Sequence, residues 1–256
     1  METNKLCREV ALGMIACIVV SSSFADESVV VVAADGVVTV ADTAGKTKTL
    51  VKSKSVLPAA NILTTGSNAR AVVRVGENGI IVVGKNSQVE INKTKDNIGF
   101  FKQITGVVYY AINSIKGKQR PIEVRTATTT IGIRGTRFLV TDTPELNEIG
   151  MRKGQVDVAS IEGDFEIHKK AELDEFSAFQ KEAETAIAKE QSDFEQYNAK
   201  NQKEFIEFKR EFKLEANRMA SFDGKKVVDL PLSGETKKNM ESFEDYAEEW
   251  LKAIHD

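Results

Sequence analysis

The segment TATTTIGIRGTRFLV, residues 126–140, carries the strongest fold signal in this chain. Ten of its fifteen residues are Thr, Ile, Val, Phe or Leu, which favour the pleated, half-buried surface of a β-strand, and none is proline. Gly132 and Gly135 interrupt the run, and a glycine inside a strand pattern usually marks a bulge, a corner or a close approach of two backbones. The segment therefore predicts two strands, or one sharply bent strand, with the bend at residues 131–136.

The same segment resembles the signature of FecR-type domains, in which threonine and alanine precede Gly-Val-Arg-Gly-Thr, a phenylalanine and a valine. Three upstream stretches resemble further elements of that family, in the expected order: Leu57–Gly66, Ala69–Val89 and Gly106–Tyr109. The resemblance covers about residues 55–160 and leaves the last third of the chain unmatched. The residues that carry it, which we expect to be structural, are Gly66, Gly132, Arg134, Gly135, Thr136 and Phe138.

The resemblance implies a twisted, solenoid-like β-fold with short strands, although the spacing of the strands fits a sandwich equally well. It also implies signalling, because FecR-type domains in their best-known setting relay a signal from an outer-membrane receptor to a cytoplasmic sigma factor. The chain shows no counterpart of the cytoplasmic domain and no internal transmembrane helix. We therefore expect a stand-alone role in envelope sensing or protein binding.

Residues 1–25 have the pattern of a secretory signal peptide. Residues 10–20 are apolar and follow a short basic start, and Ser23-Phe24-Ala25 fits a cleavage site. An apolar stretch of this length is too short to cross a membrane as a helix. We expect an exported protein, periplasmic or extracellular, that begins at Asp26 and has no transmembrane helix after signal removal.

Both cysteines, Cys7 and Cys17, lie inside this predicted signal peptide. The exported protein would then have neither a disulfide framework nor a thiolate metal site. The alternative is a lipoprotein anchored at Cys17, with Met14–Cys17 as its recognition sequence. The apolar residues that follow Cys17 make this alternative weaker, because a mature lipoprotein normally continues into a polar tether.

Residues 26–167 predict an all-β domain. Short β-branched runs recur about every ten residues, from Val29–Val32 to Phe165–Ile167, and no helical pattern separates them. Three sequences between such runs have the chemistry of tight hairpin turns: Asp35-Gly36, Glu77–Gly79 and Glu162–Asp164. Even spacing of this kind favours a sandwich, a barrel or a solenoid.

No residue pattern points to catalysis, a cofactor or a metal, so we expect a protein that is not an enzyme. The sequence has no recognisable nucleophile motif, and its glycine pairs lack the strand-to-helix context of a phosphate-binding loop. Arg125, Arg134 and Arg137 either form an anion-binding patch or pair with nearby acidic residues such as Glu123 and Asp142. The interleaved aromatic residues of a single-strand nucleic-acid binder are absent, so we expect no nucleic-acid partner.

The composition changes near residue 165. Residues 26–163 carry a net charge of +5 and residues 164–256 a net charge of −8, and neither glycine nor proline occurs between Asp164 and Asp223. The abundance of Ala, Glu, Lys and Gln predicts a helical arm over residues 168–256. Its parts are a long helix over about 169–222, a linker over 223–234 and a last helix over about 235–254.

Several apolar residues of the predicted long helix recur eleven positions apart, which keeps an apolar stripe nearly straight along a helix. Such a stripe is more often a packing face than a ligand site. It would pack against its own β domain, against the last helix as a hairpin, or against a second copy or a protein partner as in a coiled coil. A membrane surface is the weaker alternative, because the charged faces mix both signs and carry a net negative charge. The candidate contact residues are Phe194, Phe205, Phe208 and Phe212.

The sequence thus favours an exported, non-enzymatic protein with a FecR-like domain that acts as an envelope sensing or protein-binding module. The alternative is a structural or scaffold component of the cell envelope or surface, assembled through the helical arm. Within that arm, Lys225–Leu232 predicts an added edge strand. Apolar residues of the last helix, Met240, Phe243, Ala247, Trp250 and Ile254, share one face that we expect to close against the long helix.

Overall fold

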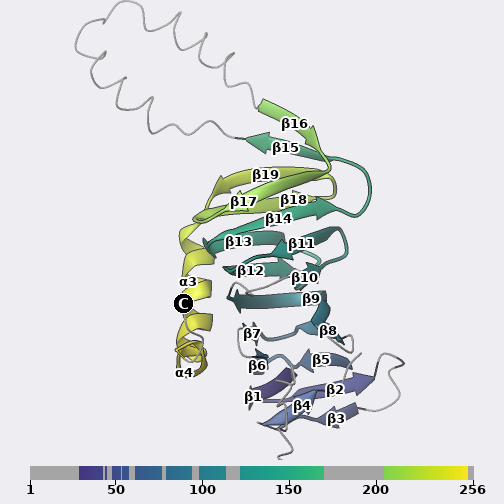
Figure 1. Cartoon of the computed structure of the whole chain (residues 1–256), viewed down its shortest axis with the longest axis vertical. Helices are drawn as coiled ribbons and strands as arrows, with labels where there is room; N and C mark the ends of the chain where they lie inside the picture. The colour runs from purple at the N-terminus through teal and green to yellow at the C-terminus, as the bar shows by residue number, and fades with distance from the viewer. Residues whose placement is uncertain are drawn as a thin grey trace, which may run out of the picture.

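A computed structural model describes residues 29–42, 44, 48–52, 54–57, 61–76, 79–93, 98–113, 122–169 and 205–252. These residues form nineteen strands and two short C-terminal helices. The strands stack along the long axis of the molecule, and the helices run along one side of the stack (Figure 1). The predicted signal peptide lies outside the described residues.

The strands form two layers. Sheet A contains, in spatial order, β4 (Ser55–Leu57), β1 (Val29–Asp35), β6 (Arg70–Val75), β7 (Gly79–Val83), the second half of β9 (Ile98–Ile112), β12 (Thr136–Asp142), β13 (Asn147–Lys153), β18 (Arg218–Asp223), β19 (Lys226–Pro231), β15 (Phe165–Lys169) and β16 (Phe205–Lys209). Sheet B contains β3 (Lys48–Leu50), β2 (Val38–Asp42), β5 (Asn61–Thr65), β8 (Gln88–Lys93), the first half of β9, β10 (Ile122–Arg125), β11 (Thr129–Ile133), β14 (Gln155–Ser160) and β17 (Glu211–Glu215). Neighbours pair antiparallel except β9 with β10 and β15 with β19, which are parallel.

The chain passes repeatedly from one sheet to the other at sharp corners. The predicted bend at residues 131–136 is confirmed, because β11 of sheet B ends at Ile133 and β12 of sheet A begins at Thr136. Gly135 between them has a φ of 70°, a left-handed conformation that glycine adopts without steric cost. Gly106 has a φ of 101° at the point where β9 leaves sheet B and enters sheet A.

Two of the three predicted hairpin turns are wrong. Asp35-Gly36 and Glu162–Asp164 do not join paired strands, because β1 and β2 lie in different sheets, as do β14 and β15. Both are corners, and their glycines have φ values of 70° and 72°. At Glu77–Gly79 the flanking strands β6 and β7 pair antiparallel, as a hairpin requires, and Glu77 and Asn78 lie outside the described residues.

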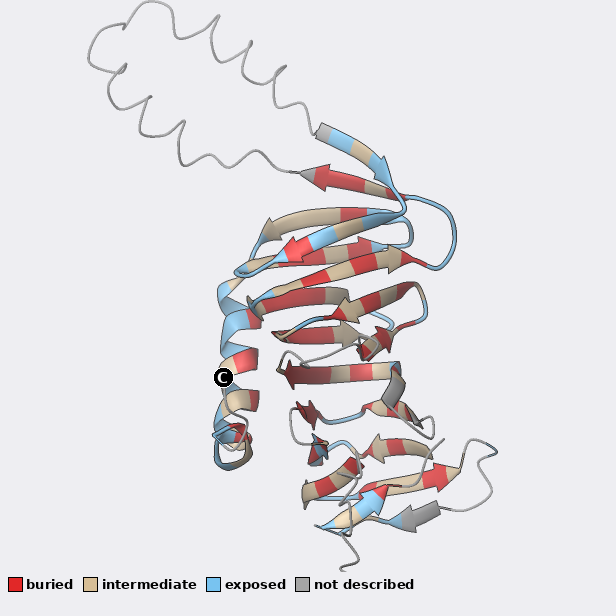
Figure 2. Ribbon diagram, in the orientation of Figure 1, coloured by how far each residue is buried: buried red, intermediate tan, exposed pale blue. Residues whose placement is uncertain are grey.

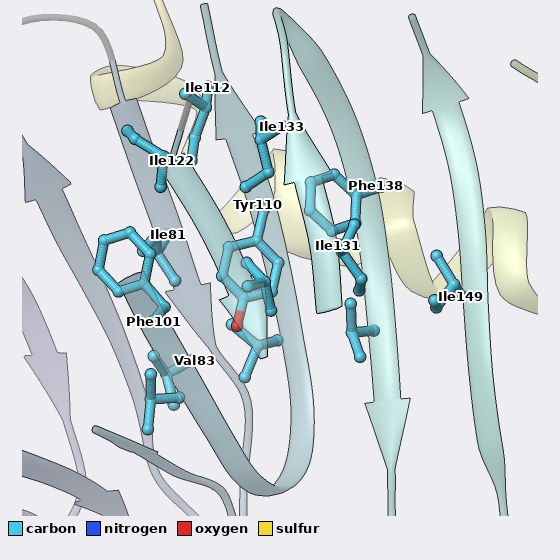
Figure 3. Packing of buried hydrophobic residues seen from close by; sticks show 14 of the residues in the cluster. Ile81, Val83, Phe101, Tyr110, Ile112, Ile122, Ile131, Ile133, Phe138 and Ile149 are labelled. Atoms are coloured by element: carbon cyan, nitrogen blue, oxygen red, sulfur yellow. The ribbon is translucent and has the colours of Figure 1, made fainter. Parts of the chain in front are cut away.

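The main core lies between the two sheets. Inward-facing residues of both sheets form one buried cluster, with Tyr110 at its centre (Figure 3). The Tyr110 ring stacks on Phe138 at a centroid distance of 5.0 Å and lies 6.4 Å from the ring of Phe101 in sheet B. The predicted all-β fold is confirmed for this part of the chain, as an open sheet that β9 folds into two packed layers.

The predicted long helix over residues 169–222 is wrong for residues 205–222. These residues form β16, β17 and most of β18, and β16–β19 pair with β13, β14 and β15. The sheets therefore continue past residue 167. Alternation explains the strands: Phe212 and Leu214 of β17 face the core, while Glu211, Lys213 and Glu215 are exposed. Residues 170–204 lie outside the described residues.

The predicted last helix is present as α3 (Gly234–Tyr246) and α4 (Glu248–Leu251). Ser233 is the N-cap of α3, and its hydroxyl accepts a hydrogen bond of 3.0 Å from the backbone N–H of Thr236. The helices pack on the outer face of sheet A rather than on a second helix, which corrects the predicted hairpin. The extended segment before them is β19, an interior strand between β18 and β15 rather than an edge strand.

Candidate protein-interaction surface

The signature residues lie at corners and in the core. Phe138 is fully buried between the sheets, and Thr136 is buried beside it on β12. Gly66 donates a backbone hydrogen bond of 2.9 Å to Val37, where two corners meet. Arg134 is exposed at the corner before Gly135. Gly132 is an ordinary strand residue, since a Cβ added there would come no closer than 3.8 Å to the neighbouring Asp157.

Arg125 and Arg137 do not share the predicted anion-binding patch. Arg125 pairs with Glu123 at 2.8 Å and lies over the ring of Phe100, 4.0 Å from its centroid, on the outer face of sheet B. Arg137 lies on β12 and alternates with the buried Phe138, so it points to the outer face of sheet A. The two side chains therefore lie on opposite faces of the two-layered fold, and for Arg125 the predicted pairing with Glu123 is confirmed.

The outer face of sheet A is apolar in its middle and is covered by the helices. Val72, Ile80, Val82, Tyr109 and Leu139, from β6, β7, β9 and β12, form a second buried cluster with residues of α3 and α4. The helix residues in this cluster are Met240, Phe243, Ala247 and Leu251, with Trp250 partly buried against it. The four strands are thus buried on both faces.

Polar contacts fix the helices to this face. The Tyr109 hydroxyl donates a hydrogen bond of 2.6 Å to Glu244 Oε1. Arg152 of β13 lies 3.7 Å from Glu244 and 3.6 Å from Glu241. Burial, reinforced by the bond to Glu244, raises the pKa of Tyr109, so this hydroxyl stays protonated and remains a donor. The middle of the outer face of sheet A is therefore covered by α3 and α4 of the same chain.

The edge of sheet A at β16 is different. Among the strands in the described residues, β15 is the one neighbour of β16. Phe208 is 69% exposed and Ile206 is 44% exposed, and most of this strand is coloured as exposed in Figure 2. The register places Phe208 opposite Glu166 and Ile206 opposite His168. Two exposed apolar side chains therefore lie on a strand that has no second neighbouring strand within residues 29–169 and 205–252 as described.

The four predicted contact residues have different surroundings: one is exposed, one is in the core, and two are not described. Phe208 is exposed at the β16 edge, as a contact residue must be. Phe212 packs in the core, with its ring 5.6 Å from Phe165 and 6.4 Å from Phe222. Phe194 and the side chain of Phe205 lie outside the described residues. The predicted stripe is therefore wrong as a helical face for Phe208 and Phe212, which lie on strands.

Sequence reasoning missed the charged residues of the same edge strand. Glu207 and Lys209 form an ion pair, and the register places them opposite the core residues Ile167 and Phe165 of β15. They therefore point to the opposite face of sheet A from Phe208. The signal that could have found them is the alternation of apolar and charged residues in Ile206–Lys209, which is typical of a strand with two different faces.

Among the described residues, no group of three or more His, Cys, Asp or Glu side chains is placed to hold a metal ion. Neither of the two helices in the described part is long and apolar enough to span a membrane.

Comparison with known proteins supports the resemblance in the signature segment. Residues 61–157, from the start of β5 into β14, match the family model described as "FecR protein". A comparison with curated proteins finds no match. Two crystal structures of a "putative anti-sigma factor" from Parabacteroides distasonis, at 2.50 and 1.65 Å resolution, align with a TM-score of 0.45 and 11% identity. The alignment covers 69% of this chain and 62% of theirs, so this chain spans about three fifths of that length.

Proposed function

We propose that this chain is an exported, non-enzymatic FecR-domain module that senses or binds a protein of the cell envelope, with the β16 edge as its binding surface. The observation that carries this proposal is the open edge of sheet A, where Phe208 and Ile206 are exposed on a strand with a single described neighbour. An edge strand offers unpaired backbone N–H and C=O groups to a strand of another protein.

The FecR domain itself offers less free surface. Its strands β6, β7, β9 and β12 are covered by sheet B on one side and by α3 and α4 on the other. The strands after residue 205 extend sheet A beyond that domain and end in β16. Sheet A therefore runs without interruption from the covered strands of the FecR domain to the exposed edge strand β16.

The proposal includes export, which rests on the pattern of residues 1–25. The protein purified from its native envelope is expected to begin at Asp26 and to carry no lipid. Intact-mass measurement tests this expectation, because a lipidated Cys17 would add residues and about several hundred daltons of acyl chains. A lipidated terminus would replace the soluble module with a membrane-anchored one.

A pull-down from envelope fractions tests the binding surface. The full chain should retain a protein partner, and Phe208→Ser should reduce that retention at least about tenfold, because apolar anchors dominate binding. Leu50→Ser is the matched control, since Leu50 of β3 is 67% exposed but lies at the opposite end of the stack. If both variants lose partner retention equally, or if both retain the partner as the wild type does, β16 is not the binding surface.

A scaffold role is the second candidate, and exposed apolar residues at the far end of the stack favour it. Val56 of β4 is 64% exposed and Leu50 is 67% exposed, each on the last strand of its sheet. Contact between one end and the opposite end of the next molecule would build an open filament. Light scattering that grows with concentration and is abolished by Leu50→Ser would support this role over the sensing module.

A further inference from the structure

We infer that β16 pairs with β16 of a second copy of this chain, in an antiparallel, two-fold arrangement centred on Phe208. The inference rests on the proposed function, in which β16 is the binding edge, and it names the occupant of that edge. Alternate peptide groups of an edge strand point away from its one neighbour, so they are available to a further strand. Phe208 and Ile206 stand beside them on the outer face of the sheet.

The order of charges in β16 is complementary about Phe208. Glu207 precedes Phe208 and Lys209 follows it. In an antiparallel pair centred on Phe208, each Glu207 lies opposite Lys209 of the other copy, and the two Phe208 rings lie opposite each other. Opposite charges and aromatic rings are the cross-strand pairs that stabilise antiparallel sheets. β16 is thus complementary to a second β16 in this antiparallel arrangement.

The same charges disfavour the neighbouring register. If the pair were centred on Glu207, the two Glu207 carboxylates would face each other, which destabilises a strand pair. Charges that point toward the core side of an edge strand normally protect that edge from pairing. Glu207 and Lys209 lie on that side. They would therefore disfavour a strand that lacks the complementary order of charges, and a second copy has that order in one register.

The resulting dimer would be closed and weak. A two-fold axis at Phe208 uses the same patch on both copies and joins the two A sheets edge to edge, so it does not propagate into a filament. In this register only Glu207, Phe208 and Lys209 of each copy lie opposite residues of the other β16, so the interface is small, below the area that gives a tight complex. The dimer should therefore form in a concentration-dependent manner.

Charge exchange tests the register. In sedimentation equilibrium of the full chain over about 5–200 µM, the mass should rise toward two copies. Glu207→Lys alone and Lys209→Glu alone each place like charges opposite each other, so each should weaken association at least about tenfold. An equimolar mixture of the two variants restores both opposite-charge pairs and should restore the dimer. Lys213→Glu on the adjacent β17 is the control, because it makes the same change in charge outside β16.

The outcomes separate this inference from the proposed function. Restoration in the mixture would support self-pairing and would also show that neither variant is unfolded. A wild-type chain that stays a monomer throughout, or a mixture that is no heavier than its components, would overturn self-pairing. If such a chain still retains an envelope protein through Phe208, the proposed function stands and the edge takes a strand of a different protein.

Discussion

The middle of sheet A and its last strand differ in how much of each is covered. β9 and β12 have a strand on each side, the main core on one face and the helices on the other. β16 has one described neighbour and exposes Phe208 and Ile206. The sequence reflects this, because residues 107–112 of β9 are all apolar, whereas Ile206–Lys209 alternates apolar and charged residues. The covered strands supply stability, and the exposed strand is the binding edge that we propose.

The largest expected effect is at the bend of β9. Gly106 has a φ of 101°, and a Cβ added there would lie 2.5 Å from the Ser87 Cα. Gly106→Val therefore combines backbone strain with overpacking and should lower the free energy of unfolding by about 3–5 kcal/mol. Urea unfolding measures this. A loss below about 1 kcal/mol would show that the middle of the sheet tolerates a different path between the layers.

The helix cover gives the next effect. Met240 is fully buried between α3 and the outer face of sheet A. Met240→Ala should cost about 2–4 kcal/mol, because it leaves a cavity in the second cluster. Lys238→Ala on the exposed side of the same helix should change stability by less than about 0.5 kcal/mol. Equal effects of the two substitutions would mean that the helix contributes little to covering the sheet.

The two glycines of the signature segment form a matched pair. Gly135→Val should cost more than about 1 kcal/mol, because its φ of 70° is unfavourable for a β-branched residue. Gly132→Ala should be neutral or stabilising by up to about 1 kcal/mol, because a Cβ fits at this strand position. Thermal melting of both variants tests the difference. A tolerated valine at position 135 would mean that the corner is placed wrongly.

The smallest effect concerns pH. Burial raises the pKa of the Asp142 carboxyl, and the backbone hydrogen bond from Ala127 opposes this only in part. Burial also raises the pKa of Glu148. The folded state then holds protons more tightly than the unfolded state, so stability should fall as the pH rises from about 4 through the raised pKa values.

Asp142→Asn removes one of these ionisations and should flatten that decline. Urea unfolding at several pH values between about 4 and 7 measures the slope. Glu145→Gln, at an exposed position beside it, controls for the change in net charge. A slope that both substitutions alter equally would point to overall charge rather than to the buried carboxyl.

Local residue chemistry predicted most of the strands and their main corner. Thr129–Ile133 and Thr136–Asp142 are β-branched and aromatic, and Gly135 marks the bend between them. Local residue chemistry did not predict whether the strand after a turn stays in the same sheet or enters the other one. Asp35-Gly36 has hairpin chemistry, but pairing with strands distant in the sequence turns it into a corner between layers.

The end of the sheet was misread because two periodicities compete there. Phe205, Phe208 and Phe212 are spaced three and four apart among Glu and Lys, which favours an amphipathic helix. The same residues form strands because apolar and charged side chains alternate along them. This alternation is interrupted at Arg210, where the chain passes from β16 in sheet A to β17 in sheet B. Phe208 was identified as a contact residue, but its place at an edge depends on the long-range pairing of β15 with β16.

Hydrogen exchange of the full chain at several protein concentrations tests most directly whether β16 is the open edge that a second copy covers. We expect amides of β12 to exchange slowly at every concentration, because this strand is paired on both sides. Amides of β16 should exchange quickly in dilute protein and more slowly as the concentration rises, while those of the opposite edge strand β3 stay unchanged. Exchange of β16 that is slow in dilute protein, or that does not depend on concentration, would contradict this account.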